Sequence, residues 1–400
     1  MPLPRSIRHP LPPRPGGPRP SRLRLPLATA LLASCLCAVA PAPATAAART
    51  DTELQRRLDD LVRATGGPPG VIVVLRNGGR TRVVRSGVAD LDTGRPLRTT
   101  DHTRIASTAK AFSGAVALAL VRQGKLALDD TIGEHLPQLP KAWHAVTLRN
   151  LLNHTSGLPD YSKDPDFLKL IQADPRRTFD PQHLLDFVAD KPLDFPAGSE
   201  YHYSNSDNIA VALMAEEASG LPYDALLREK VYGPTGLRHT SLPLGYTMPR
   251  PYMHGYDVRS APPEDVSELI SASGVWASGG IVSTPQDLTR FIRAYAAGAL
   301  TSEDALVQQR RWIEGASEPA GPGENKAGLA IFRYRTRCGT VLGHTGNTPG
   351  YTQLIAATPD GTHSLTVSLT AQINRTTNPA LLEQLRAAEE EAVCALLDKK

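Results

Sequence analysis

The chain has 400 residues, of which 41% are hydrophobic and 21% are charged. That composition is typical of globular proteins and excludes a disordered, collagen-like or coiled-coil chain. The formal net charge is +4, but residues 1–46 contain six arginines and no acid, so residues 47–400 carry 38 basic and 40 acidic residues and a net charge of −2. The apparent basicity therefore does not indicate a nucleic-acid partner.

Residues 1–46 have the organisation of an export signal. A basic stretch that ends at Arg24 precedes the apolar residues 25–40, and Ala-Thr-Ala at 44–46 has the spacing that signal peptidases accept. We predict a signal peptide over residues 1–46 and a secreted mature chain that begins near Ala47. The apolar run has 16 residues, whereas about 20 are needed to cross a bilayer, and we expect no membrane span in the mature protein.

The cysteines fit an exported protein. Leu-Ala-Ser-Cys at 32–35 resembles the box that is cut before a lipidated cysteine, so a lipoprotein anchored through Cys35 is an alternative, but the apolar sequence continues past this residue. Cys35 and Cys37 lie within the signal, which leaves Cys338 and Cys394. In an oxidising compartment we expect these two to form a disulfide; the alternative is two buried thiols.

The first elements of the mature chain are a helix and a hairpin. Leucine and valine recur at helical spacing over residues 52–65, and two glycines follow as a stop signal. Residues 70–76 and 80–88 read as strands that flank Asn-Gly-Gly at 77–79, and Asn-Gly between β-rich runs is a strong hairpin signal.

The pattern from residue 107 to about 298 is mostly helical. We expect helices over 107–123, 147–152, 181–190, 207–219, 223–231 and 285–297. After Gly323 the pattern changes to strands separated by Gly, Pro and Asp turns, at 329–334, 340–344, 351–357 and 364–370. A last helix is expected over 379–397, capped by Asn378 and with proline in its first turn.

This order of elements predicts an α/β (α+β) chain with one sheet built from both of its ends. Residues 47–400 would form a single catalytic unit, in which 47–106 and about 301–400 make the sheet part and about 107–300 make a mostly helical insertion.

The tetrad Ser-Thr-Ala-Lys at 107–110 stands where a helix should begin. Residues three apart on a helix share a face, so Lys110 would lie beside the hydroxyl of Ser107. A serine alcohol needs a neighbouring base to become a nucleophile, and a lysine with a lowered pKa can serve as that base. By itself the pattern is weak, because most such tetrads are ordinary helix surface.

Two further motifs strengthen the assignment. Tyr-Ser-Asn at 203–205 precedes a predicted helix, and His-Thr-Gly at 344–346 ends a predicted strand; each of the three patterns occurs once, in this order. In this respect the chain resembles the penicillin-recognising serine hydrolases. Residues 151–158 (LLNHTSGL) and 279–288 (GGIVSTPQDL) are similar to the branch that contains class C β-lactamases and soluble D-alanyl-D-alanine carboxypeptidases. Histidine at 344, where class C β-lactamases generally have lysine, points toward the carboxypeptidases.

The resemblance implies a serine β-lactamase or penicillin-binding-protein-like fold, with an antiparallel sheet flanked by N- and C-terminal helices and an inserted all-helical region. It implies a secreted serine D-alanyl-D-alanine carboxypeptidase that acts on peptidoglycan stem peptides and is inhibited covalently by β-lactams. A class C-like β-lactamase, an esterase or a D-aminopeptidase on the same scaffold is an alternative, as is a penicillin-binding sensor without turnover.

Roles for individual residues follow from the same resemblance. Ser107 would attack the substrate carbonyl and form an acyl-enzyme, and Lys110 and Tyr203 would share proton transfer. The residues expected to bind substrate are Asn205, His344, Thr345, Gly346 and Asn347. Among them, Thr345 would offer its hydroxyl to the substrate carboxylate, and the N–H groups of Ser107 and Asn347 would form the oxyanion hole.

Other side chains with chemical potential have more ordinary interpretations. We expect His154 to hold a loop by hydrogen bonding. Arg333, Arg335 and Arg337 alternate along a strand, where one of them could bind a substrate carboxylate, although a solvated strand face is slightly favoured. The eleven histidines show no metal-binding spacing, so we expect neither a metal nor another cofactor.

Overall fold

A computed structural model of the chain describes residues 46–376 and 378–399, with only the backbone described for 46–50. The described residues form one compact unit. Apart from Ala46, the predicted signal peptide lies outside the described residues, as do Cys35 and Cys37. Within the described ranges, no helix combines the length and the apolar content needed to cross a membrane.

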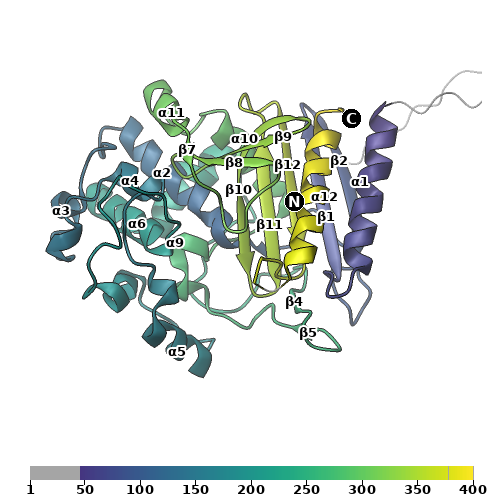
Figure 1. Ribbon diagram of the computed structural model, residues 1–400, viewed down its shortest axis with the longest axis horizontal. Helices are drawn as coiled ribbons and strands as arrows, with labels where there is room; N and C mark the ends of the chain where they lie inside the picture. The colour runs from purple at the N-terminus through teal and green to yellow at the C-terminus, as the bar shows by residue number, and fades with distance from the viewer. Residues whose placement is uncertain (1–45, 377, 400) are drawn as a thin grey trace, which may run out of the picture. The chain divides into compact units, whose positions relative to one another are not determined.

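The centre of the fold is an eight-stranded antiparallel sheet (Figure 1). Its order is β2-β1-β12-β11-β10-β9-β8-β7. The strands are β1 (Gly70–Asn77), β2 (Arg80–Gly87), β7 (Ile313–Glu314), β8 (Glu324–Ala327), β9 (Phe332–Thr336), β10 (Gly339–Thr348), β11 (Tyr351–Ala357) and β12 (His363–Leu369). The predicted fold class is confirmed: an antiparallel sheet with flanking helices and a helical region.

Strands from the two ends of the chain meet in the middle of this sheet. β1 pairs with β12 in antiparallel register, with Val71 opposite Leu369 and Leu75 opposite Leu365. Every residue of β11 is buried, because this strand has β12 and β10 on its sides and helices on its faces. The expectation of one sheet built from both ends of the chain is therefore confirmed.

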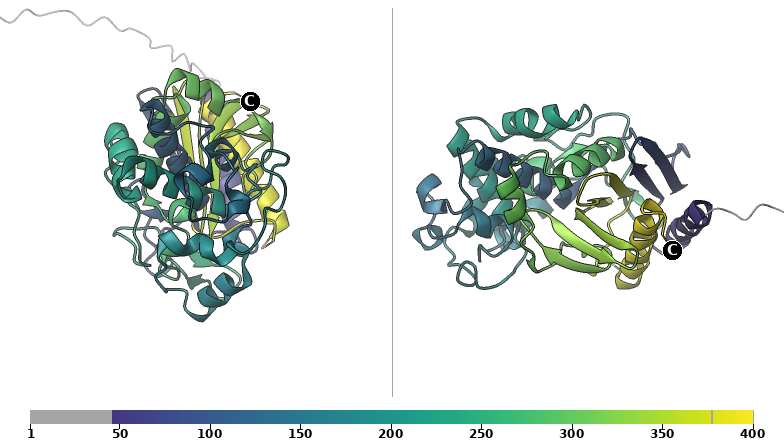
Figure 2. Two further views of the ribbon diagram at one scale, coloured as in Figure 1. Left: turned by 90° about the vertical axis from the view of Figure 1, so that its left-hand side faces the viewer. Right: turned by 90° about the horizontal axis from the view of Figure 1, so that it is seen from above.

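Helices cover both faces of the sheet (Figures 1 and 2). α1 (Ala46–Arg63) and α12 (Pro379–Leu396) lie side by side on one face. On the other face α10 (Pro285–Ala296) packs on β11 and β12, and α2 (Ala109–Arg122) reaches β10. The Asn378 side chain accepts a hydrogen bond from the Leu381 N–H at 3.0 Å, so it caps α12 as predicted.

The insertion between β2 and β7 is mostly helical. Besides α2 and α10 it contains α3 (Ile132–His135), α4 (Leu148–Leu152), α5 (Pro165–Ala173), α6 (Asn205–Ser219), α7 (Tyr223–Leu226), α8 (Gly233–Thr235), α9 (Trp276–Gly279) and α11 (Glu303–Gln309). Two predicted helices differ in form: residues 181–188 are a 3₁₀ helix, and α7 continues as a π-helical turn over Leu227–Tyr232. Helices α3, α5, α8, α9 and α11 were not predicted.

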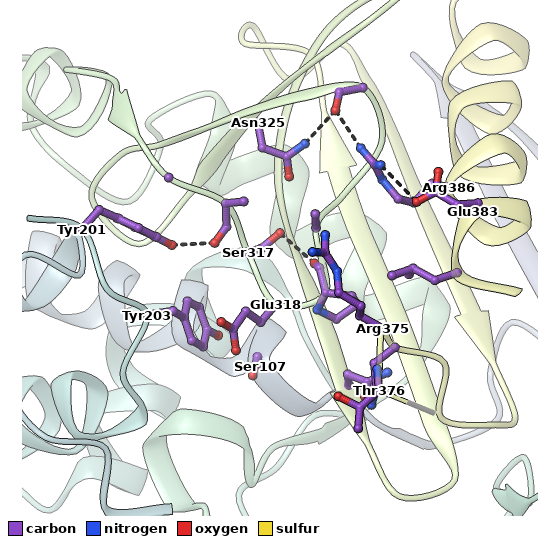
Figure 3. A pocket seen from close by; sticks show the side chains of 18 of the residues that line it. Ser107, Tyr201, Tyr203, Ser317, Glu318, Asn325, Arg375, Thr376, Glu383 and Arg386 are labelled. Atoms are coloured by element: carbon purple, nitrogen blue, oxygen red, sulfur yellow. Dashed lines mark hydrogen bonds and ion pairs between the residues drawn. The ribbon is translucent and has the colours of Figure 1, made fainter. Parts of the chain in front are cut away.

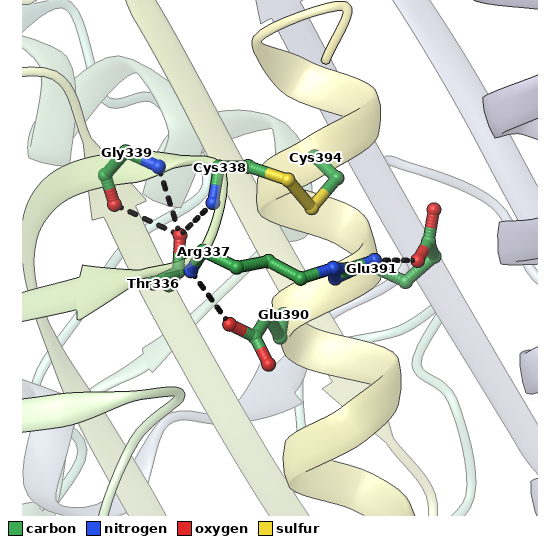
Figure 4. Close-up of a disulfide and its surroundings, with 7 residues drawn as sticks. All are labelled: Thr336, Arg337, Cys338, Gly339, Glu390, Glu391 and Cys394. Atoms are coloured by element: carbon green, nitrogen blue, oxygen red, sulfur yellow. Dashed lines mark hydrogen bonds and ion pairs between the residues drawn. A yellow bond between two sulfur atoms is a disulfide. The ribbon is translucent and has the colours of Figure 1, made fainter. Parts of the chain in front are cut away.

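Cys338 and Cys394 form a disulfide, so that prediction is confirmed (Figure 4). The bond joins the turn between β9 and β10 to the last turns of α12, across 56 residues of chain. Beside it, the Arg337 guanidinium pairs with the Glu391 carboxylate. The C-terminal helix is thereby fixed covalently to the sheet that it covers.

We predict that replacement of Cys338 and Cys394 together by alanine lowers the free energy of unfolding by about 4 kcal/mol. A disulfide that closes a loop of this length lowers the conformational entropy of the unfolded chain, and the loss is equivalent to about that free energy. Urea denaturation of the oxidised and the mutant proteins measures the difference. A single Cys394→Ala variant serves as the control and should lose as much as the double variant; a loss below about 1 kcal/mol in both would contradict the prediction.

Candidate active site

Ser107 lies just before the first turn of α2. It is the middle residue of a 3₁₀ turn, Ala106–Thr108, and not the first residue of the α-helix as predicted. The preceding residue, Ala106, has φ of 48°, a left-handed conformation that is uncommon for a residue with a side chain and is concentrated at functional sites. This backbone turn places the Ser107 side chain at the edge of a cavity, whereas Thr108 is buried.

The Lys110 amine has no exposed surface and three polar neighbours. Its Nζ lies 3.1 Å from the Ser107 Oγ, 2.7 Å from the Asn205 Oδ1 and 2.9 Å from the Ser278 carbonyl oxygen. The serine and the lysine are therefore in contact, as the spacing of the tetrad predicts.

Burial makes this lysine a base. Removal from water lowers the pKa of Lys110 to about 7, against the opposing effect of the Asp160, Glu318 and Asp207 carboxylates. A neutral amine has two N–H donors and one lone pair. When Asn205 and Ser278 accept the two N–H bonds, the lone pair is left for the Ser107 hydroxyl. The geometry thus suits transfer of the serine proton to Lys110.

Tyr203 forms the wall beside this pair. The Lys110 Nζ lies 5.0 Å from the centre of the Tyr203 ring, and the buried phenolic oxygen makes no hydrogen bond of normal geometry within the described residues. Burial raises the pKa of Tyr203 well above 10, while the nearby Ser107 side chain acts in the opposite direction. The phenol therefore stays protonated near neutral pH, and Lys110 is better suited than Tyr203 to take the serine proton.

Asn205 is oriented from two sides. Helix α6 begins at Asn205, two residues earlier than predicted, so this side chain projects from the first turn. Its Oδ1 faces Lys110, while its Nδ2 donates to the Ser162 hydroxyl at 2.9 Å and to the Asp160 carboxylate at 3.3 Å. These bonds fix which end of the amide faces the lysine.

Behind Tyr203 lies a buried pair of His154 and Asp207. The two ring centres of His154 and Tyr203 are 4.4 Å apart, and the His154 Nδ1 lies 2.7 Å from the Asp207 Oδ2. Asp207 also accepts a hydrogen bond from the Ser156 hydroxyl. Burial lowers the pKa of His154 to about 3 and raises the pKa of Asp207 well above its ordinary value. Burial thus disfavours the charged form of both groups, and their hydrogen bonds hold the 153–158 loop against the tyrosine.

The third motif lies on β10 and is buried. His344 places Nδ1 2.6 Å from the Thr345 carbonyl oxygen, and burial lowers the pKa of this imidazole to about 3, so His344 is neutral. The Thr345 hydroxyl donates to the Pro319 carbonyl oxygen at 2.5 Å. The sequence resemblance implies that this hydroxyl binds a substrate carboxylate, whereas in the structure it is hydrogen-bonded within the protein.

Gly346 allows β10 to approach the nucleophile. A Cβ at this position would lie 2.4 Å from the Ile105 carbonyl oxygen and 3.1 Å from the Ser107 amide nitrogen, so a larger residue would push the strand away. The next residue, Asn347, lines the same cavity as Ser107. Its side chain is turned toward Thr352 and the Ile373 carbonyl oxygen, which leaves its backbone as the part that can face a substrate.

The cavity in front of Ser107 has a volume of about 980 Å³, and Figure 3 shows the side chains that line it. Of the predicted site residues, it exposes Ser107, Tyr203, Asn205 and Asn347. Lys110 and the 344–346 motif lie behind this surface. The remaining lining comes from Tyr201 and from three segments that carry no motif: residues 315–325, residues 374–376, and the part of α12 that contains Leu382, Glu383 and Arg386.

Sequence reasoning missed two of the exposed charged residues of this cavity, Glu318 and Arg375. Neither belongs to a recognisable pattern, and no signal in the chain would have singled them out. The three arginines that were considered lie elsewhere: Arg333 and Arg335 belong to β9, and Arg337 pairs with Glu391. None of these three lines the cavity. In the part of the chain that the structure describes, no cluster of His, Cys, Asp and Glu side chains could hold a metal ion.

Comparison with known proteins agrees with this geometry. The family model described as Beta-lactamase matches residues 55–392 of the chain. Penicillin-binding protein 4* of Bacillus subtilis is 26% identical over 67% of this chain and 60% of its own length, so the chain spans less than two thirds of that relative. Esterase EstB of Burkholderia gladioli is 30% identical over 63% of this chain and 72% of its own length.

Solved structures are similar over most of the described chain. The D-stereospecific amidohydrolase from a Streptomyces species superposes with a TM-score of 0.72 at 26% identity, over 84% of this chain and 98% of the amidohydrolase. A penicillin-binding protein, an esterase and an amidohydrolase are thus all similar to the chain.

We predict that the rate of acylation of Ser107 rises with pH with a midpoint near 7, because only the unprotonated amine of Lys110 can accept the serine proton. Incubation with benzylpenicillin followed by intact-mass measurement gives the rate at each pH. A Ser107→Ala variant provides the baseline and should form no adduct. A rate of acylation that decreases as the pH is raised from 6 to 8, or an adduct on the alanine variant, would be inconsistent with this mechanism.

Proposed function

Because the chain belongs to the beta-lactamase family of serine hydrolases, we propose that it is an exported D-alanyl-D-alanine carboxypeptidase that acts on peptidoglycan stem peptides. Export rests on the sequence of residues 1–46 alone. In this proposal β-lactams are covalent inhibitors, since they acylate the same serine. The serine hydrolase fold is the common property of the family, and the carboxypeptidase specificity is the proposed part.

The proposed reaction uses Ser107 as the nucleophile. Its Oγ bonds to the carbonyl carbon of the penultimate D-alanine while the hydroxyl proton passes to Lys110 Nζ. The bond between this carbon and the terminal D-alanine nitrogen then breaks, and the leaving amine takes up a proton. Water hydrolyses the resulting ester and restores the serine. The N–H groups of Ser107 and Asn347 would bind the oxyanion in both steps.

Arg375 is the observation that favours a carboxypeptidase. It is exposed, it lines the cavity together with Ser107, and within the described residues no hydrogen bond or ion pair engages its guanidinium (Figure 3). The guanidinium of the other cavity arginine, Arg386, already donates hydrogen bonds to the Gly321 and Gly323 carbonyl oxygens. A free guanidinium suits a terminal carboxylate, which it can bind with two parallel hydrogen bonds.

A D-amino-acid amidase or D-aminopeptidase is the second candidate. The D-stereospecific amidohydrolase is similar over nearly its whole length, and proteins named D-aminopeptidase from Cereibacter sphaeroides are 31% identical over 60% of this chain. Such enzymes would share the nucleophile and the base with a carboxypeptidase and would differ in which end of the substrate the cavity binds.

Four substrates separate these activities: a peptide ending in D-Ala-D-Ala, a D-amino acid amide, nitrocefin and a short-chain ester. We expect rapid release of D-alanine with slow turnover of nitrocefin. Faster cleavage of the amide would favour the second candidate, and ester cleavage alone would identify an esterase. Acylation by penicillin without turnover of any substrate would indicate a sensor.

We predict that Arg375→Ala lowers kcat/KM for the D-Ala-D-Ala peptide by about tenfold or more, since a charge-assisted hydrogen bond contributes about 1.5–3 kcal/mol. Hydrolysis of a neutral short-chain ester should change little. Arg335→Ala on β9, outside the cavity, is the matched control. Equal losses for peptide and ester would argue against a carboxylate-binding role for Arg375.

A further inference from the structure

Residues 315–320 form one wall of the cavity and are held rigidly. They connect β7 to β8 and run past Tyr201, Tyr203 and Ser107. Hydrogen bonds anchor the segment at three points: Tyr201 OH to the Ala316 carbonyl oxygen (2.5 Å), the hydroxyls of Ser317 and Tyr334 to each other (3.0 Å), and Thr345 Oγ1 to the Pro319 carbonyl oxygen (2.5 Å).

Gly315 brings the start of this segment against the Tyr201 ring. Its φ is 156°, and a Cβ there would lie 2.6 Å from ring atoms of Tyr201, so only glycine fits. Because Tyr201 precedes Tyr203 by two residues, the wall segment is positioned by the same stretch of chain that positions Tyr203. Side chains on the segment therefore have a fixed relation to the nucleophile.

Glu318 projects from this wall into the cavity. In Figure 3 its carboxylate points toward Tyr203 and lies above Ser107. The side chain is exposed, and in the described part of the chain no hydrogen bond or ion pair engages its carboxylate. The negative charge of Glu318 is among the influences that raise the pKa of the buried Lys110, which shows that its field reaches the catalytic group.

The other carboxylate of the cavity is engaged. Glu383 lies 3.6 Å from the Arg386 guanidinium. An ion pair made by an exposed acid usually contributes little to stability. Glu318 differs in its position: it is an anion without a partner among the described residues, and it lies beside the serine at which the substrate carbonyl oxygen must become a negative oxyanion. Such a charge opposes the reaction unless the substrate neutralises it, and Coulomb attraction makes a cation the group that does so.

We propose that Glu318 binds a positively charged ammonium group of the substrate, an inference that rests on the proposed hydrolysis of D-amino-acid peptides at Ser107. Glu383 and Arg386 of this cavity pair with each other, so Glu318 and Arg375 are the anion and the cation that it offers to a substrate carrying both charges. The ammonium has two possible sources: the side chain of a diamino acid that precedes D-Ala-D-Ala, or the free α-amino group of a D-amino acid derivative.

Two matched pairs of reagents test the proposal and separate the sources. Nα-acetyl-L-Lys-D-Ala-D-Ala and its Nα,Nε-diacetyl form differ only in the side-chain ammonium, and release of D-alanine is measured as kcat/KM. Ampicillin and benzylpenicillin differ only in an α-ammonium, and the rate of acylation of Ser107 is measured by intact mass. The quantity of interest in each pair is the ratio of the charged to the uncharged member.

We expect the wild-type protein to favour the charged member of at least one pair by about tenfold at low ionic strength, and this ratio to fall toward 1 in Glu318→Gln. Glu318→Asp should retain part of the preference for the charged member. Glu318→Gln also lowers the pKa of Lys110, but that effect acts on both members alike and cancels in the ratio. Glu314→Gln is the control, because Glu314 belongs to β7, pairs with Lys326 and does not line the cavity.

The outcomes distinguish this inference from the proposed function. Equal rates within both pairs in the wild-type protein, or a preference that survives Glu318→Gln, would overturn the ammonium site even if D-alanine is released. A preference for ampicillin without cleavage of either peptide would support the ammonium site and overturn the carboxypeptidase assignment. A protein that reacts with neither pair would overturn both.

Discussion

The Lys110 amine has no exposed surface, and an ammonium ion buried in this way would be costly unless it were neutralised or fully paired. Its three polar neighbours come from separate parts of the insertion: the turn before α2, the start of α6 and the short helix α9. The packing of these elements therefore produces both the hydrogen bonds that replace water and the lowered pKa that makes the amine a base. A shift of any one element would expose the lysine and return it to its ordinary protonated state.

Local spacing made part of this arrangement predictable. The helical repeat places Lys110 beside Ser107, and residue patterns predicted the long helices and every strand of the sheet except β7 and β8. Contacts made by backbone groups, such as the Ser278 carbonyl, leave no trace in a sequence. Glu318 and Arg375 could not be found for a related reason: their importance comes from a cavity assembled by distant segments, and a single exposed charge looks the same in a sequence whether it faces solvent or a nucleophile.

The buried and the exposed titratable groups of the site occupy different environments. Lys110, His154 and His344 are buried, and burial lowers the pKa of each. Glu318 and Arg375 are exposed in the cavity and lie on segments outside the three motifs. Under the proposed roles, changes at Glu318 and Arg375 would alter which substrate is accepted, and a change at Glu318 would also shift the pKa of Lys110.

The pairing of β1 with β12 has a consequence for biogenesis. β1 obtains this partner only when residues 363–369 have been made, so the sheet cannot close before the whole insertion and the later strands are available. Until then one edge of this apolar strand is unpaired and could pair with another unfolded chain. Loss of β12 would therefore expose an edge of β1, and a chaperone that shields β1 until β12 is available would protect the yield of folded protein.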